Sequence, residues 1–244
     1  FSQGINTLIW RPSPLPGFTM NRPLALSTPS ASTGWGASIA RHRVLRNTYA
    51  LLSMTLLFSA AIAGLAVALQ APPAGLVITL VGYFGLLFLV HKLQHSGWAI
   101  PVVFALTGFM GYTLGPVLAK HLALPGGAQT IALALGATGA TFLALSAWVL
   151  ASRRDFSFMG GFLFAGMVIA LLAGLGAVFL QLPALSLAVS AMVALLSAGM
   201  ILFETSRIVN GGETNYVLAT VGLFVSLFNL FTSLLSLFGF GSND

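Results

Sequence analysis

The chain has 244 residues, of which 57% are hydrophobic and 6% are charged, whereas about a quarter are charged in a typical globular domain. The formal net charge is +6, but the basic residues are spread along the chain, so neither nucleic-acid binding nor an acidic substrate is indicated. Cysteine is absent, which excludes disulfides, thiolate metal sites and a cysteine nucleophile. This composition is typical of an integral membrane protein.

The first forty residues differ from the rest of the chain. Residues 1–40 are rich in Pro, Ser, Thr and Gly and have no periodic apolar pattern, so we expect a disordered tail. Met20 is the first plausible initiator, and residues 1–19 are expected to be upstream or non-native sequence. We expect a single membrane domain over residues 41–244.

From Asn47 to Phe240 the chain alternates between long apolar runs and short polar gaps, and seven of its eight charged residues lie in the gaps. A helix needs about 20 apolar residues to cross a bilayer. The second run is long enough if it extends through His91 and Lys92, whose polar ends can reach the interface. The sequence predicts an all-α, polytopic bundle of seven transmembrane helices at Asn47–Leu69, Ala74–Val90, Trp98–Ala119, Ala128–Ala151, Phe158–Leu180, Ala184–Phe203 and Tyr216–Phe240.

The basic residues predict the orientation of this bundle. Seven of them lie on one side, before the first helix or after the second, fourth and sixth (Arg41, Arg43, Arg46, Lys92, Arg153, Arg154 and Arg207). The alternate loops contain Lys120 alone. Because cytoplasmic loops carry the excess of Lys and Arg, the N-terminus is predicted to be cytoplasmic and the C-terminus periplasmic.

The seventh run carries a stripe of small and polar residues. The stripe recurs at spacings of four and three, which places its members on one helix face: Gly222, Ser226, Asn229, Ser233 and Ser236. Lipid offers no hydrogen-bond partners, so this stripe must face protein or water. It is either a packing seam between helices or the wall of a hydrated path, and the two are compatible.

Glu204, at the inner edge of the sixth run, is the one charged residue that does not lie in a gap. If the sixth helix continues to about Val209, Glu204 lies more than a turn inside its cytoplasmic end. Membrane-embedded carboxylates are rare and indicate proton or ion function. The alternative is an interfacial ion pair with Arg207, three residues further on, that anchors the helix end.

No catalytic or metal-binding arrangement is evident. The histidines flank the predicted helices, and no carboxylate stands near His91 and His95 to complete a metal site. We therefore expect no enzyme, no cofactor and no resident metal. The oligomeric state is left open.

Three segments resemble motifs of the Bax inhibitor-1 family, also called the transmembrane Bax inhibitor motif family: Arg46–Tyr49, Thr107–Pro116 and Phe203–Tyr216. The resemblance covers the chain from about Arg41 onward and is strongest to the bacterial YccA-like branch. It implies a seven-helix bundle with the seventh helix central, surrounded by the other six.

The resemblance also implies two functions. Members of the YccA-like branch are implicated as substrates and modulators of FtsH, a membrane-anchored AAA protease that removes unassembled membrane proteins. Other family members act as pH-sensitive calcium leaks, gated by carboxylates on the sixth and seventh helices. Glu204 matches the first carboxylate, whereas Ser226 stands where the second is expected.

We expect a non-enzymatic bacterial inner-membrane protein that is a substrate or modulator of FtsH in membrane-protein quality control. The alternative is a pH-sensitive calcium or cation leak, with Glu204 as the titrating group and Arg207, Ser226 and Asn229 beside it. In that case Ca²⁺ would be a transported ion. A coupled transporter is a third function, with less support in the sequence because only one span holds a charge.

Overall fold

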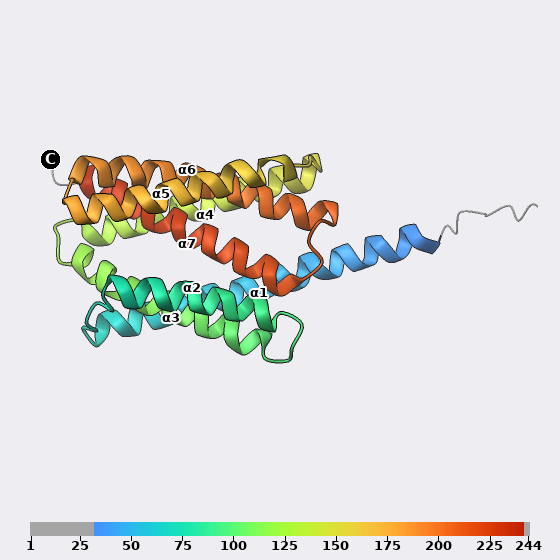
Figure 1. Cartoon of the computed structure of the whole chain (residues 1–244), viewed down its shortest axis with the longest axis horizontal. Coiled ribbons are helices and arrows are strands. Elements are labelled where there is room, and N and C mark those ends of the chain that lie inside the picture. The colour runs from blue at the N-terminus through green and yellow to red at the C-terminus, as the bar shows by residue number, and fades with distance from the viewer. Residues whose placement is uncertain (1–31, 242–244) are drawn as a thin grey trace, which may run out of the picture.

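The structure, a computed structural model, describes residues 32–241, which form seven α-helices and one short 3-10 helix (Figure 1). The elements are α1 (Ser32–Ala68), α2 (Leu76–Leu93), α3 (Ala99–Leu122), α4 (Gly127–Ser152), η1 (Ser157–Met159), α5 (Gly160–Leu180), α6 (Pro183–Asn210) and α7 (Tyr216–Gly241). Each α-helix contains a stretch long and apolar enough to cross a membrane. The predicted all-α, seven-span fold is confirmed.

α1 and α6 extend furthest beyond the predicted boundaries. α1 begins at Ser32, within the segment that the composition predicts to be disordered, because adding residues to an existing helix costs far less than nucleating one. Its first turns project beyond the other helices (Figure 1). α6 continues past Phe203 to Asn210 and ends at Gly211, whose φ of 79° is the left-handed conformation that glycine adopts most readily. Residues 1–31 of the predicted tail lie outside the described part of the chain.

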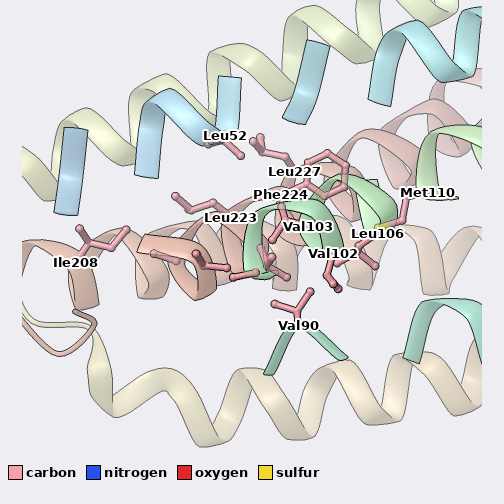
Figure 2. Packing of buried hydrophobic residues seen from close by; sticks show 14 of the residues in the cluster. Leu52, Val90, Val102, Val103, Leu106, Met110, Ile208, Leu223, Phe224 and Leu227 are labelled. Atoms are coloured by element: carbon pink, nitrogen blue, oxygen red, sulfur yellow. The ribbon is translucent and has the colours of Figure 1, made fainter. Parts of the chain in front are cut away.

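α7 occupies the middle of the bundle. It packs against α6, α4 and α1, and more lightly against α3. Half of its apolar span is buried, the largest share of the seven spans. A cluster of buried side chains from α1, α2, α3 and α6 surrounds Leu223, Phe224 and Leu227 of α7 (Figure 2). The side of α7 toward α2 and α5 is less tightly covered, and this side positions the candidate site.

α1 and α3 approach each other most closely at two glycines. A side chain on Gly111 would overlap the backbone carbonyl of Ser59, and one on Gly115 would overlap Ala66. Small residues at such positions let helix backbones come together in a membrane, where packing rather than hydrophobic burial drives association. Gly111 and Gly115 therefore allow the close packing of α3 against α1.

Candidate functional site

A cavity of about 850 Å³ lies beside α7, between α2 on one side and α5 and α6 on the other. α2 packs chiefly against α3, and α5 packs against α6, and residues of both α2 and α5 line the cavity. The wall on α7 is one helix face that carries both apolar and polar residues: Leu218, Val221, Gly222, Val225, Ser226 and Asn229. Gly222, Ser226 and Asn229 of the α7 stripe therefore face this cavity.

The charged residues gather at one end of the cavity. Glu204 is 8% exposed, and its Oε2 lies 3.7 Å from Nη1 of Arg207. Nη2 of Arg207 donates a hydrogen bond to Oε2 of Glu213 at 3.0 Å, and the guanidinium also lies 5.4 Å from the centre of the Phe203 ring. Arg207 therefore bridges two carboxylates, of which Glu213 is the closer partner.

The turn between α6 and α7 holds Glu213 in place. The Glu213 backbone N–H donates to the carbonyl of Arg207 at 3.0 Å, and the Asn215 N–H donates to Oε1 of Glu213 at 2.9 Å. Oδ1 of Asn215 accepts a hydrogen bond from the Val217 N–H at 2.9 Å, which caps the first turn of α7. Its Nδ2 donates to the carbonyl of Gln94 at 3.2 Å. The turn is thereby tied to the α2–α3 loop.

The loop between α4 and η1 is tied to the same end of α6. The Phe156 N–H donates to Oγ of Ser206 at 2.9 Å, and this hydroxyl donates to the carbonyl of Arg154 at 3.2 Å. Nδ2 of Asn210 donates to the same carbonyl at 3.3 Å. Residues of the last turns of α6 and the turn that follows it therefore connect three loops at one end of the bundle.

The α7 stripe meets Glu204 at Gly222. A methyl group on Gly222 would lie 2.8 Å from the carboxyl carbon of Glu204, so the Glu204 side chain would have to shift to admit a side chain at position 222. Ser226, one turn further on, donates its Oγ to the Gly222 carbonyl at 2.8 Å. Asn229 lines the cavity a turn beyond Ser226. The structure thus brings the predicted site residues Glu204, Arg207, Ser226 and Asn229 to one cavity.

The other half of the stripe lies elsewhere. Ser233 is 6% exposed and Ser236 donates its Oγ to the Thr232 carbonyl at 2.9 Å, and neither lines the cavity. Near them, Leu235 of α7 packs against Ala134 of α4. The five-residue stripe therefore divides into a cavity wall and a packing seam.

Sequence reasoning placed neither Glu213 nor His91 at the candidate site, although both line the cavity. The pairing of Glu213 with Arg207 could have been predicted from the sequence. Gly211 and Gly212 lie between the two residues and favour a tight turn, which would bring Glu213 back toward Arg207. His91 had no such signal, since its place depends on how α2 sits relative to α7. Its Nδ1 lies 3.0 Å from the carbonyl of Leu87.

The candidate site is a charged, hydrogen-bonded cluster at the end of a mainly apolar cavity. Among the described residues there is no group of three or more His, Cys, Asp or Glu side chains that could hold a metal ion. Ca²⁺ prefers six to eight oxygen ligands, and here both carboxylates face a guanidinium. The arrangement is suited to charge pairing with a proton or a polar group.

The fold and the site define a seven-helix membrane bundle with a charged cluster between α6 and α7. Residues 41–243 match the family model described as "Inhibitor of apoptosis-promoting Bax1", and the chain belongs to this family, the Bax inhibitor-1 family. It is 53% identical over 206 residues to a protein of Escherichia coli K12 named "Modulator of FtsH protease YccA", which covers 84% of this chain and 94% of that protein.

Two further relatives have no stated function. An uncharacterized protein of Pseudomonas aeruginosa is 48% identical over 82% of this chain and 90% of its own length. An uncharacterized membrane protein of Vibrio cholerae is 44% identical over 92% of this chain and its entire length. The similarity therefore extends through all seven helices.

Proposed function

We propose that the chain is a non-enzymatic inner-membrane protein that modulates the membrane-bound AAA protease FtsH. The observation that carries this proposal is the 53% identity to the Escherichia coli modulator of FtsH protease over 94% of that protein. The names of the relatives describe a modulator and membrane proteins, which supports a role in binding rather than in catalysis.

The orientation that fits this role places the charged cluster on the cytoplasmic side. The start of α1 and the loops after α2, α4 and α6 lie at the same end of the bundle (Figure 1). All the basic residues of the membrane domain except Lys120 lie at this end. By the positive-inside rule this end faces the cytoplasm, and the C-terminus is periplasmic.

The projecting start of α1 is the element through which FtsH would engage the protein. An AAA protease must take hold of a segment outside the bilayer before it can pull on a helix, and in the described part of the chain α1 is the helix that extends furthest beyond its neighbours (Figure 1). The projecting turns, residues 32–40, directly precede the basic residues at the start of the membrane span.

The test uses bacterial cells that lack their own YccA and express the full chain. We expect expression to slow the FtsH-dependent turnover of an unassembled membrane protein, measured by pulse-chase, and FtsH to co-purify with the chain. Deletion of residues 1–40 should abolish both effects, whereas the matched deletion of residues 1–31 should retain them. Unchanged turnover despite normal accumulation of the full chain would contradict the proposal.

A cation leak remains the second candidate function. The observation that favours it is the position of Glu204 inside α6, at the same cavity as Ser226 and Asn229 of α7. In this proposal Glu204 is the titrating group, Arg207 its counter-charge, and Ca²⁺ the transported ion. A charge inside a membrane span is costly and needs such a partner.

A further inference from the structure

Two neighbouring hydroxyl groups on α1 are buried without a hydrogen-bond partner. Thr48 is 0% exposed, and neither its Oγ1 nor the phenolic oxygen of Tyr49 meets a donor or an acceptor within the described part of the chain. Both residues lie inside the membrane span of α1 and belong to the Arg46–Tyr49 motif, which the candidate site does not use. Because an unpaired polar group is costly to remove from water, each of these hydroxyls needs a partner.

A change of rotamer does not supply a partner for Tyr49. A serine or threonine on a helix can turn its hydroxyl to the carbonyl four residues earlier. Thr138 and Ser226 do so, with oxygen–oxygen distances of 2.7 and 2.8 Å. The phenolic oxygen of a tyrosine stands at the far end of a rigid ring and cannot turn back to its own helix in this way. Buried tyrosine hydroxyls usually have a partner, so the partner of Tyr49 must come from outside α1.

Two further buried hydroxyls occur on the helices beside Tyr49. The Tyr49 ring lies 5.9 Å from the ring of Phe142 on α4. Ser146 follows Phe142 by one helical turn and therefore lies on the same face of α4. Its Oγ lies 3.5 Å from Oγ1 of Thr205 on α6, and the two residues are 4% and 0% exposed. This separation exceeds the usual hydroxyl–hydroxyl distance of about 2.7–2.8 Å, so both groups can take another partner.

α7 contributes a fifth hydroxyl. Oγ1 of Thr220, which is 0% exposed, lies 3.3 Å from the carbonyl oxygen of Thr48 and 2.7 Å from that of Tyr216. A hydroxyl has one hydrogen, so Thr220 donates to the nearer carbonyl and its lone pairs can still accept. Two residues of an α-helix turn through about 200°, so Thr220 points away from the cavity that Gly222 faces. α7 packs against α1, α4 and α6, and the buried hydroxyls lie at this junction.

The chemistry of this junction selects water as the ligand. Its polar side chains are uncharged hydroxyls, each able to donate one hydrogen and to accept others: Thr48, Tyr49, Ser146, Thr205 and Thr220. An ion would find no opposite charge among them, and an acyl chain would leave the hydroxyls unpaired. A water molecule both donates and accepts, and buried waters typically make about three hydrogen bonds to groups that otherwise have no partner.

We propose that the junction of α1, α4, α6 and α7 holds ordered water that is bound by the hydroxyls of Thr48 and Tyr49. The water completes the hydrogen bonds of α1 and links this helix to its neighbours on the side of α7 away from the cavity. The inference is independent of any action on FtsH and of ion flux through the cavity. It gives the Arg46–Tyr49 motif a binding role.

The first test uses the sign of a stability change. Tyr49→Phe removes the phenolic oxygen and little else. If water binds this oxygen, we expect the midpoint of thermal unfolding of the full chain in detergent to fall by roughly 2–4 °C. If the oxygen is unpaired, its removal should raise the midpoint. Tyr112→Phe is the matched control, because the Tyr112 hydroxyl donates to the Pro72 carbonyl at 3.0 Å and its loss calibrates a paired phenol. An unchanged or raised midpoint in Tyr49→Phe would overturn the proposal.

The second test separates water from a protein partner. An experimental structure of the full chain is determined at a resolution that shows ordered water, together with that of Tyr49→Phe. We expect a density peak about 2.8 Å from the phenolic oxygen in wild type, and its loss in the variant. Thr48→Val, which keeps the shape of the side chain, should weaken the same density. A direct hydrogen bond from Tyr49 to a protein group would overturn the proposal. So would an empty map beside this hydroxyl when ordered water is visible elsewhere in the protein.

Discussion

The carboxylate of Glu204 on α6 lies directly against the backbone of Gly222 on α7, so that a methyl group at position 222 would lie 2.8 Å from its carboxyl carbon. α6 and α7 have one of the most extensive contacts in the bundle, and this pair stands at its charged end. Position 222 must be small for Glu204 to reach the cavity. The pair therefore couples the packing of two helices to the position of a charge.

Gly222→Ala should destabilise the protein by about 1–3 kcal/mol relative to Gly85→Ala. Alanine is favoured over glycine in a helix by up to about 1 kcal/mol, and this gain is realised at Gly85, where a methyl group meets nothing within 4 Å. At Gly222 the methyl group must displace the Glu204 carboxylate. Thermal unfolding in detergent, followed by circular dichroism, measures the difference.

A double variant identifies the cause. If the cost arises from the Glu204 side chain, adding Glu204→Ala to Gly222→Ala should bring its effect close to that of Gly85→Ala, because residues in contact are not additive. Persistence of the full cost in the double variant would show that another neighbour of Gly222 is responsible.

Arg207→Gln should lower the free energy of unfolding by about 1–3 kcal/mol. It leaves Glu204 and Glu213 without the guanidinium that lies 3.7 and 3.0 Å from them. The cost stays below that of a fully buried pair because the Arg207 side chain is 32% exposed. Combining it with Glu204→Gln and Glu213→Gln should recover much of the loss in chemical denaturation. No recovery would indicate that Arg207 acts through Phe203 instead.

Ser226→Asp tests the cation-leak alternative. Ser226 lines the same cavity as Glu204 and lies one turn from Gly222, so an aspartate there would place two carboxylates near each other. Neighbouring carboxylates resist double ionisation, which makes their charge sensitive to pH near neutrality. We expect Ser226→Asp to create or increase pH-dependent calcium flux in liposomes that contain only this protein.

Glu204→Gln is the control for that gain, and it should abolish the flux of the Ser226→Asp protein. Ser226→Asn, which is similar in size and uncharged, should give no gain. Strong calcium flux in wild type that survives Glu204→Gln would mean that the ion path lies outside this cavity.

Reporter fusions test the orientation. Because basic residues are retained in the cytoplasm, fusions after one set of loops should report a periplasmic location (Gln70, Lys120 and Gln181). Fusions after the other set should report a cytoplasmic location (His95, Arg154 and Gly212). A cytoplasmic signal from a C-terminal reporter would contradict the proposed orientation.

The helices were predictable because hydropathy is a local property of the chain. All seven apolar runs correspond to helices, and the extension of the second run through Lys92 was expected from the reach of its side chain. The start of α1 was not predictable in this way. Pro, Ser and Gly before Arg41 indicate disorder by composition, yet the helix extends into this segment to Ser32.

The candidate site was partly predictable for the same reason. Glu204 and Arg207 are three residues apart on one helix, so their proximity follows from helix geometry. The contact of Glu204 with Gly222 depends on how α6 and α7 pack, which no local pattern specifies. A path along the α7 stripe was one of the two predicted alternatives, but its place between α2 and α5 was not predictable, because six helices around the seventh gave no reason for a gap there.

The hydrogen bonds at the end of α6 have a consequence for how the bundle would come apart. Asn215 holds the α2–α3 loop, and Ser206 and Asn210 hold the segment before η1, but none of these bonds involves α1. α1 is held mainly by its contacts with α3 and α7. A pull on the N-terminus would therefore withdraw α1 while the hydrogen bonds around the end of α6 remain in place, and it would expose the face of α3 that carries Gly111 and Gly115 to lipid first.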